Sequence, residues 1–311
     1  MHLDEINFSL VNFCNAKCIF CPRSEFEHKT KFMPLRLLER IVDEILSKDF
    51  PFKILLSHIG ENGESTLHPE LVDALRIIKR IGHYTDLYTN FSHLTDQLIT
   101  IFDKNLLNSF HTNIDGLTSR SYYDVKGLDY NTVENNILNF LKLRNKRPFP
   151  LFIHIITTQN YAKSVESFFG ARAFFLSKNR IFDSFIENEA QLIKEKWEKH
   201  IEPGLGDKIG IDSCLMWAER DHIPKLNGNF TCYNIERLKH AAFIAPNGDW
   251  YFCCFDIKNQ LVLGNLYKES LVDLANSNKR KEIIEMLEAK KFNKVGPPCD
   301  RVDCCQVVRG F

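Results

Sequence analysis

The sequence lacks the features that define several large classes of protein. It has no excess of charge, because 40 lysine and arginine residues balance 40 aspartate and glutamate residues, which disfavours an electrostatic nucleic-acid partner. Its longest apolar run, residues 149–156, is too short to cross a bilayer and is interrupted by His154. Its first residues, MHLDEINFSL, lack the basic start and long apolar stretch of a signal peptide. We therefore expect a cytoplasmic protein with reduced thiols and neither a nucleic-acid nor a membrane partner.

The sequence also has no cysteine over most of its length. Cys14, Cys18 and Cys21 stand near the N-terminus, and the next cysteine is Cys214. The other six are Cys232, Cys253, Cys254, Cys299, Cys304 and Cys305. Cysteines scattered through a core would not leave such a gap, so the distribution predicts two separate thiolate sites.

The region between the two groups alternates short apolar segments with amphipathic ones. The expected strands are 5–11, 53–59, 86–89, 109–114, 150–157 and 208–212. The expected helices are 35–46, 69–81, 95–102, 130–143 and 162–176. This order is typical of βα units around a parallel sheet. We predict an α/β fold, a partial (β/α)6 barrel with its reactive groups at the carboxyl ends of the strands.

The pattern changes twice towards the C-terminus. Residues 177–206 are interpreted as an insertion whose polar helix, 187–200, is expected to be solvated and to cover the edge of the barrel. Apolar segments 241–245 and 250–255, separated by Pro-Asn-Gly-Asp, predict a β-hairpin, and one helix is expected over 271–290. We predict a barrel domain over residues 1–227 and a small hairpin-plus-helix module over residues 228–311.

The first three cysteines follow the first expected strand with C-x3-C-x2-C spacing. Soft thiolates select zinc or iron–sulfur clusters, and a structural zinc site needs four protein ligands. Three thiolates without a local fourth partner suit a four-iron cluster with one open iron, which can hold a small molecule.

This spacing, with Phe20 before the last cysteine, resembles that of the radical S-adenosylmethionine (SAM) enzymes. The resemblance implies a [4Fe–4S] cluster whose open iron chelates SAM. It further implies that reductive cleavage of SAM yields a 5′-deoxyadenosyl radical, which removes a hydrogen atom from the substrate. An electron donor such as flavodoxin or ferredoxin is implied as a partner.

A segment after the second expected strand resembles the Gly-Glu-Pro motif with which this family binds the SAM amino group. The segment contains Glu61, Gly63 and Glu64, and Ser65 replaces the usual proline. Because the loop is one residue longer than usual, either glutamate could face SAM. Register with the following Leu-His-Pro-Glu favours Glu64.

Three later segments resemble further family motifs in the same order. Asn90 lies in a Thr-Asn turn with Phe91 where glycine is common, and Asn113 and Asp115 end the fourth expected strand. Lys126 precedes a glycine where the family usually has Arg-Gly.

Strand periodicity adds candidates that do not depend on the family. It places His111, Asn113 and Asp115 on one face of the fourth strand, and His154 alternates along the next strand. Asn113, Asp115 and His154 are therefore candidates to contact SAM or substrate. A hydrogen-bonded core histidine is the alternative for His154.

The later cysteines resemble the twitch or SPASM auxiliary-cluster module of many radical SAM enzymes. Cys253 follows Gly248 with Gly-x4-Cys spacing, and four thiolates complete a second [4Fe–4S] cluster. The expected ligands are Cys232, Cys253, Cys299 and either Cys304 or Cys305. A zinc site of the same geometry is the alternative.

Three thiols remain beyond the seven that two clusters need. Cys214 ends the sixth expected strand and Cys254 adjoins a predicted ligand. Either could donate a hydrogen atom to a substrate radical, as in radical SAM epimerases, or could be an inert buried cysteine.

The resemblance to short twitch enzymes favours oxidation or epimerisation of a sugar- or aminocyclitol-like small molecule. The alternative within the family is a maturase of ribosomal peptides that performs Cα epimerisation or cross-linking. A third hypothesis is a non-catalytic iron–sulfur or zinc-binding protein.

Overall fold

A computed structural model describes the protein in residues 2–18, 21, 23, 32–60, 62–93, 96–157, 187–213, 230–232, 234–256, 258–300 and 307–309. The chain forms two compact units. The first contains Met1–Cys14, Pro22–Asp86 and Met216–Phe311, and the second contains Asn15–Cys21 and Leu87–Leu215. Among the described residues, no helix combines the length and the apolar character that crossing a membrane requires.

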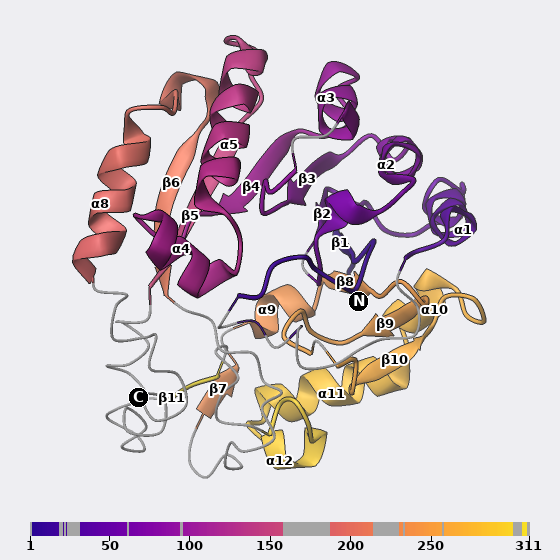
Figure 1. Cartoon of the computed structure of the whole chain (residues 1–311). Coiled ribbons are helices and arrows are strands. Elements are labelled where there is room, and N and C mark those ends of the chain that lie inside the picture. The colour runs from indigo at the N-terminus through magenta and orange to yellow at the C-terminus, as the bar shows by residue number, and fades with distance from the viewer. Residues whose placement is uncertain are drawn as a thin grey trace. The chain divides into compact units, whose positions relative to one another are not determined.

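The first unit is built on a mixed sheet (Figure 1). Its neighbouring strands are, in spatial order, β10 (Val262–Asn265), β9 (Asp249–Tyr251), β8 (Ala241–Ile244), β1 (Glu5–Phe8) and β2 (Leu56–Ile59). Strand β1 is parallel to both β2 and β8, whereas β8 and β9 form the antiparallel pair of the predicted hairpin. A separate antiparallel pair joins β7 (Phe230–Cys232) to β11 (Val307–Arg309).

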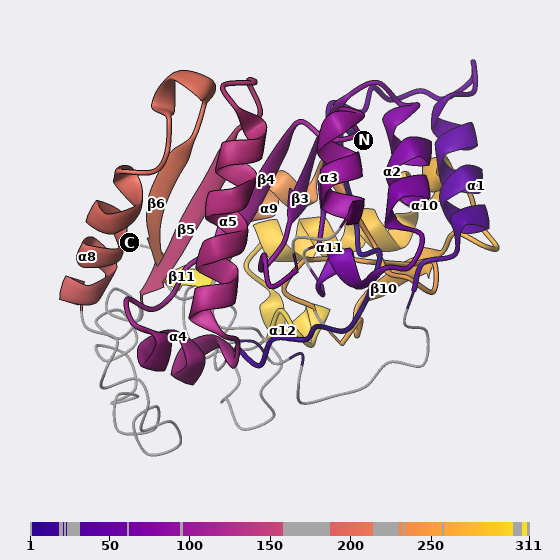
Figure 2. The ribbon, with the colours of Figure 1, turned by 45° about the horizontal axis from the view of Figure 1, so that its top comes forward.

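Helices of the first unit bury at least one apolar side chain each. They are α1 (Leu35–Ile45), α2 (Leu71–Lys79), α9 (Ile235–Leu238), α10 (Leu271–Ala275), α11 (Asn278–Glu288) and α12 (Phe292–Val295). Figure 2 shows α1 and α2 side by side. In α1 the buried residues recur with helical spacing, as Leu37, Leu38, Ile41, Val42 and Ile45.

The prediction of one helix over 271–290 is wrong, because α10 ends at Ala275 and α11 begins at Asn278. Ser277 separates them, and its Oγ accepts a hydrogen bond from the Arg280 backbone N–H at 3.3 Å. Serine and asparagine side chains compete with the helical backbone for hydrogen bonds, so a Ser at this point starts a new helix rather than continuing the old one.

The second unit contains three parallel strands, β4 (Ser109–Asn113), β5 (Leu151–Thr157) and β6 (Lys208–Ser213). Its helices are α3 (Asp96–Asp103), α4 (Ser119–Lys126), α5 (Tyr130–Arg144) and α8 (Glu187–Glu198). Strand β3 (Tyr84–Tyr88) begins in the first unit and ends in the second. An aromatic cluster forms much of the core, with ring centroids 5.0–5.9 Å apart, and consists of Phe91, Phe102, Phe110, Phe140 and Phe149.

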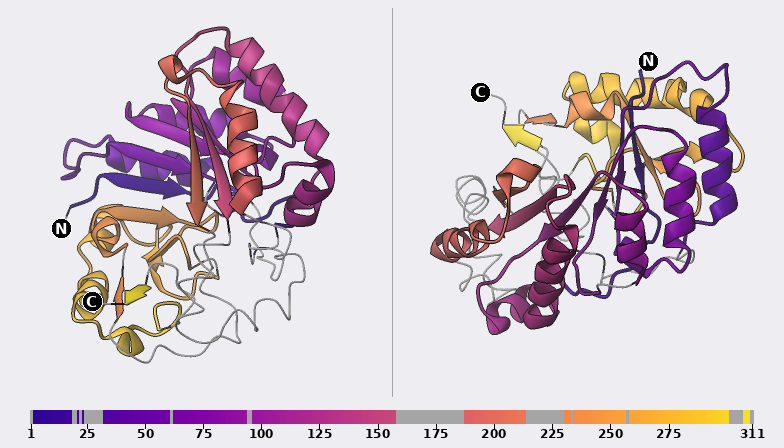
Figure 3. Two further views of the ribbon diagram at one scale, coloured as in Figure 1. Left: turned by 90° about the vertical axis from the view of Figure 1, so that its left-hand side faces the viewer. Right: turned by 90° about the horizontal axis from the view of Figure 1, so that it is seen from above.

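Helix α8 lies within the predicted insertion and packs beside β5 and β6 (Figure 3, left). Ile193 and Trp197 are each only 1% exposed, so one side of this polar helix is buried in the unit rather than solvated. The four-residue spacing of these two apolar side chains explains why they share that side. The helix predicted over 162–176 lies outside the described residues.

The predicted α/β class is confirmed, and each of the six expected strands is present. Several short elements were not predicted, among them α4, α9, β7, β10 and β11. These elements are four to eight residues long, or three in the case of β7 and β11. A hydrophobic period cannot be recognised over so few residues.

Candidate active site

In the first unit, the loop that contains Gly63 packs directly on the backbone that leads into Cys14. Gly63 has φ +157°, and a Cβ atom there would lie 2.7 Å from the Phe13 carbonyl oxygen and 2.9 Å from Val11 Cγ2. The Glu64 backbone N–H donates a hydrogen bond to the same Phe13 oxygen at 3.0 Å. Only glycine allows this close approach, so the loop holds the start of the cysteine motif in place.

Glu64, the predicted SAM-binding glutamate, is 2% exposed and locally fixed. Its Oε1 accepts hydrogen bonds from the Thr66 Oγ1 at 2.6 Å and the Thr66 backbone N–H at 3.2 Å. These bonds cap the 3-10 turn η2 (Ser65–Leu67). Glu61 lies outside the described residues, so the preference for Glu64 remains a prediction.

This loop contains a residue whose structural role sequence reasoning missed. Asn62 is buried, and its Nδ2 donates to the Tyr251 hydroxyl at 2.6 Å. The same hydroxyl is 3.0 Å from Ser9 Oγ. Asn62 therefore ties the loop to β9 and to the residue after β1. The extra loop length was the signal that could have marked it.

In the second unit, two side chains hold the residue that follows Cys14. Asn90 Nδ2 donates to Asn15 Oδ1 at 2.9 Å, and Asn15 Nδ2 donates to Ser92 Oγ at 2.8 Å. Asn90 Oδ1 also accepts from the Ser92 backbone N–H at 2.9 Å, which closes the turn. Asn90 thus fixes the cysteine loop, and its predicted contact with SAM remains untested.

Phe91 shows why this turn matches a family motif that usually contains glycine. Its φ is +54°, in the left-handed region that glycine adopts freely. The phenyl ring is completely buried against Phe110 and Phe140. Burial of the ring compensates for backbone strain of about 1–2 kcal/mol.

Lys126 forms the electrostatic centre of the second unit. Its Nζ is 3.0 Å from Asp115 Oδ2, and both side chains are buried. Burial lowers the pKa of Lys126, but the Asp115 carboxylate and the neighbouring Cys18 outweigh it and raise the pKa above the usual value. The lysine therefore stays charged.

Cys18 contacts this buried pair. Burial raises the pKa of the Cys18 thiol, and the Lys126 ammonium opposes that effect. The Lys17 backbone N–H donates to the Lys126 carbonyl oxygen at 2.8 Å, so the backbone of the cysteine loop is also fastened here. Sequence reasoning placed Lys126 in a family motif but did not predict its contact with Cys18.

Asn113 is the last residue of β4, and Asp115 lies two residues beyond it. Asp115 is fully buried, and its Oδ1 accepts from the Ile156 backbone N–H at 2.8 Å, so it joins the ends of β4 and β5. Asn113 is half-buried and pairs in register with His154. The predicted sharing of one face by His111 and Asn113 is confirmed, because both are half-buried while Phe110 and Thr112 are buried.

Aromatic and imidazole side chains line this face of β4 and β5. His111 Nδ1 is 3.0 Å from His154 Nε2, so one imidazole donates a hydrogen bond to the other. His111 stacks on Tyr88 with ring centroids 4.4 Å apart and on Phe152 at 4.5 Å. His154 is therefore hydrogen-bonded, as the alternative interpretation expected, yet it is half-buried beside polar neighbours.

The second group of cysteines lies in the first unit. Cys232, Cys253, Cys254 and Cys299 are each 6–7% exposed. Burial raises the pKa of Cys232 to about 11, and the nearby Cys254 adds to the effect. Val307 of β11 pairs with Cys232, so the chain that follows Cys304 and Cys305 runs alongside β7.

The donor chemistry of both groups fits iron–sulfur clusters. Seven cysteines lie in the described part of the chain, and none of them forms a disulfide. Buried or half-buried thiols of this kind are soft ligands suited to iron. Within the described ranges no three His, Cys, Asp or Glu side chains are grouped closely enough to hold a metal ion. The predicted site residues Phe20, Cys214, Cys304 and Cys305 lie outside those ranges.

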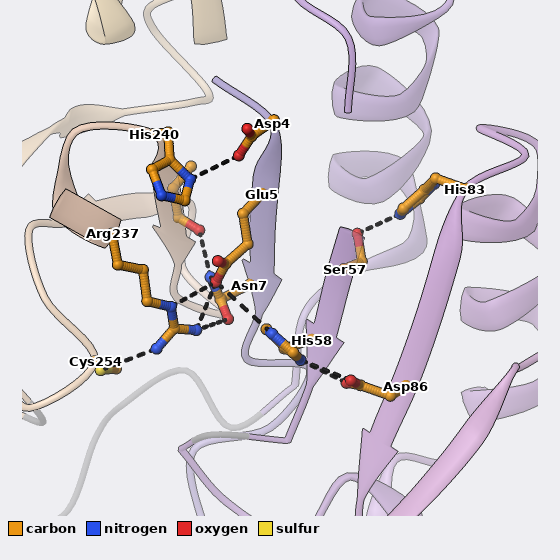
Figure 4. A network of polar contacts seen from close by, with 11 residues as sticks. Asp4, Glu5, Asn7, Ser57, His58, His83, Asp86, Arg237, His240 and Cys254 are labelled. Atoms are coloured by element: carbon orange, nitrogen blue, oxygen red, sulfur yellow. Dashed lines mark hydrogen bonds and ion pairs between the residues drawn. The ribbon is translucent and has the colours of Figure 1, made fainter. Parts of the chain in front are cut away.

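A network of polar contacts with buried carboxylates at Glu5 and Asp86 crosses β1, β2 and β3 in the first unit (Figure 4). Glu5 lies between Arg237 and His58, and His58 Nδ1 contacts Asp86 Oδ1 at 2.7 Å. Burial raises the pKa of Asp86, although His58 partly opposes it. Burial also raises the pKa of Glu5, but the hydrogen bonds and positive charge of Arg237 outweigh burial, so the pKa of Glu5 is lowered. The signal that could have found this network is the alternation of Glu5 and Asn7 in a short buried strand.

Comparison with known families gives two matches. The model of the radical SAM superfamily matches residues 8–168, and the model of an iron–sulfur cluster-binding domain, SPASM, matches residues 232–305. A segment of 86 residues is 30% identical to the tungsten-containing aldehyde ferredoxin oxidoreductase cofactor-modifying protein of Pyrococcus furiosus. It covers 28% of this chain and 23% of that protein, so the match spans about a quarter of the relative.

Solved structures share the fold at low sequence identity. BtrN in complex with AdoMet and 2-DOIA has a TM-score of 0.56 at 15% identity, covering 98% of this chain and 92% of that one. SuiB from Streptococcus suis bound to S-adenosylmethionine has a TM-score of 0.57 at 17% identity, covering 89% and 66%. The protein anSMEcpe with AdoMet and the Cp18Cys peptide has a TM-score of 0.59 at 17% identity, covering 94% and 86%.

Proposed function

This chain belongs to the radical SAM superfamily and carries an SPASM iron–sulfur domain, and on that premise we propose that it oxidises or epimerises a hydroxylated small molecule. It is an enzyme that binds a [4Fe–4S] cluster, SAM and an auxiliary iron–sulfur cluster. The observation that carries the proposal lies in the second unit, where Asn90 and Lys126 of the motif segments fasten the cysteine loop.

We assign Cys14, Cys18 and Cys21 as the ligands of the first cluster. When bound, that cluster and SAM supply a 5′-deoxyadenosyl radical that removes a hydrogen atom from the substrate. The chain itself orients the cysteine loop through Asn90 and Lys126. The buried Glu64 carboxylate provides an acceptor for an amino group such as that of SAM.

The ligands assigned to the auxiliary cluster are Cys232, Cys253, Cys299 and either Cys304 or Cys305. Cys232, Cys253 and Cys299 are buried soft donors, as this assignment requires. The thiols of both sites must be reduced to bind iron, which favours a cytoplasmic location and an electron donor such as flavodoxin or ferredoxin.

The stacked face of β4 and β5 supports a hydroxylated ring as substrate. Aromatic faces such as Tyr88 and Phe152 pack against ring carbons, and imidazoles such as His111 and His154 hydrogen-bond to hydroxyl groups. The likeness to BtrN in complex with AdoMet and 2-DOIA, over nearly the full length of both chains, points in the same direction.

Peptide maturation is the second candidate. It is favoured by the likeness to SuiB bound to the precursor peptide SuiA, with a TM-score of 0.55 at 17% identity. The third hypothesis from the sequence was a non-catalytic metal-binding protein. The superfamily match favours an enzyme instead.

The deciding experiment uses the full chain, reconstituted anaerobically with iron and sulfide. We expect about eight iron atoms per chain, as two four-iron clusters require. With SAM, a reductant and a panel of aminocyclitols, sugars and peptides, we expect 5′-deoxyadenosine and turnover of a hydroxylated small molecule. Turnover of peptides alone would select the maturase instead, and absence of 5′-deoxyadenosine would remove both.

Solvent deuterium separates the two small-molecule reactions. Epimerisation places one deuterium at the product carbon, whereas oxidation places none there. If epimerisation is found, Cys214→Ala and Cys254→Ala identify the hydrogen-atom donor, because only loss of the donor prevents deuterium incorporation. Normal turnover by a variant eliminates that cysteine.

A further inference from the structure

Arg237, at one end of the charge network, also contacts the second cysteine group. Its Nη1 donates to Cys254 Sγ at 3.7 Å, a sulfur hydrogen-bond distance. Cys254 directly follows Cys253, one of the assigned auxiliary ligands. Because a guanidinium remains protonated in proteins, a permanent positive charge lies beside this cysteine pair.

Two side chains of β1 fix the guanidinium in position. Nε and Nη2 of Arg237 donate to Glu5 Oε1 at 2.8 and 2.5 Å, and Nη2 also donates to Asn7 Oδ1 at 3.1 Å. Asn7 Nδ2 in turn donates to Glu5 Oε1 at 2.8 Å. The positive charge therefore cannot move away from Cys254 without breaking a part-buried set of hydrogen bonds (Figure 4).

Away from the cysteines, the network continues from Arg237 through Glu5 and His58 to Asp86. Glu5 lies 3.9 Å from His58 Nε2, and His58 Nδ1 lies 2.7 Å from Asp86. Glu5 and Asp86 are buried, with side chains 8% and 4% exposed. Buried charges contribute little net stability compared with apolar residues of similar volume. The network is therefore better explained by the electrostatic effect of the Arg237 guanidinium on the adjacent pair Cys253 and Cys254.

We infer that Arg237 is a positioning residue that raises the reduction potential of the auxiliary cluster. Reduction adds one negative charge to a cluster, and its potential depends on nearby charge and on hydrogen bonds to sulfur. A fixed cation beside Cys253 and Cys254 stabilises the reduced form, while Glu5 moderates that effect from the far side of the guanidinium. This inference rests on the proposed function only in requiring the auxiliary cluster.

The test is a potentiometric titration of the auxiliary cluster, followed by electron paramagnetic resonance, on reconstituted full-length protein. Arg237→Gln removes the charge and should lower the equilibrium constant for electron uptake about tenfold, which is about 59 mV for a one-electron couple. Arg237→Lys keeps a charge and should shift the potential less.

Lys239→Gln is the matched control for the loss of one positive charge. Lys239 caps the same short helix, α9, but its Nζ is held by Glu236 at 2.7 Å and Glu288 at 2.8 Å. We expect the potential of this variant to stay close to that of the wild type.

Glu5→Gln separates an electrostatic role from a merely structural one. Glutamine keeps an oxygen that accepts from Arg237 but removes the negative charge, so the potential should rise. A loosened cysteine loop would instead move the potential in the same direction in Arg237→Gln and Glu5→Gln. Equal signs in these two variants, or an unchanged potential in Arg237→Gln, would overturn the inference.

Two further outcomes distinguish this inference from the proposed function. If Arg237→Gln fails to retain the auxiliary iron, the test relies on Glu5→Gln. A rise in the potential of that variant supports the inference, and a fall overturns it. If wild-type protein binds only about four iron atoms, the auxiliary cluster itself is absent, and both the inference and that part of the proposed function fail. Formation of 5′-deoxyadenosine is then scored separately.

Discussion

At the scale of single residues, the site is built where backbone geometry leaves little choice of side chain. Gly63 permits backbone-to-backbone contact with the segment before Cys14, and Phe91 adopts a left-handed conformation that buries its ring. Both residues lie in loops that follow strands, where the sequence predicted the reactive groups. Their physical roles differ, because one position excludes a side chain and the other needs a large one.

The first residue-scale prediction concerns Gly63→Ala. The new Cβ would meet Phe13 O at 2.7 Å and Val11 Cγ2 at 2.9 Å, so the chain leading into Cys14 must move. We expect loss of iron from the first site and loss of 5′-deoxyadenosine formation. Gly82→Ala is the matched control, since Gly82 has φ +79° but a Cβ there would meet no atom within 4 Å. Iron retention by Gly63→Ala equal to that of Gly82→Ala would contradict the prediction.

The second residue-scale prediction concerns Phe91→Gly. Loss of a buried ring costs about 3–5 kcal/mol, while relief of the left-handed backbone returns about 1–2 kcal/mol. We expect a net decrease of about 1–4 kcal/mol in the free energy of unfolding, measured by urea denaturation. Phe140→Ala, in the interior of α5, loses a ring without backbone relief and should cost more. An equal cost in both variants would show that Phe91 stores no strain.

At the scale of secondary-structure elements, one buried ion pair joins three segments of the second unit. Arg144, at the end of α5, forms two hydrogen bonds with Asp207, which precedes β6. Asp207 also accepts from the backbone N–H groups of Leu151 and Glu202, each at 2.8 Å. The end of α5 and the starts of β5 and β6 are therefore fixed by one carboxylate.

Asp207→Ala should consequently destabilise the protein strongly. It leaves the Arg144 guanidinium buried without its partner, and breaking such a pair typically costs about 3–5 kcal/mol. Asp103→Ala removes a carboxylate from the exposed pair with Arg147 and should cost less than about 1 kcal/mol. Urea denaturation of both variants measures the difference. A small cost for Asp207→Ala would mean that Asp207 does not hold these elements together.

At the scale of the whole molecule, the two cysteine groups should be separable by substitution. Cys18→Ser removes a ligand of the first cluster, and Cys232→Ser removes a ligand of the auxiliary cluster. We expect each variant to retain about four iron atoms, with 5′-deoxyadenosine formation lost only in Cys18→Ser. Iron analysis and chromatography of the nucleoside products measure this. Loss of all iron in either variant would contradict two independent sites.

Element by element, the sequence was most informative where a hydrophobic period extends over many residues. Strands β1 to β6 and the long helices α1 and α5 were predicted close to their observed bounds. The break at Ser277 and the short elements α4 and α9 were not, because a single capping side chain or one turn of helix decides them.

The sequence by itself determined the α/β class, the superfamily and the two groups of cysteines, because spacing along the chain and periodicity carry that information. Only the tertiary structure showed that Lys126 lies between Asp115 and Cys18, and that Arg237 lies between Glu5 and Cys254. The contacts of Lys126 with Cys18 and of Arg237 with Glu5 join residues far apart in the chain, and a buried charge is stable only beside its partner. Which charges meet is decided by the packing of strands and helices, and no local pattern records it.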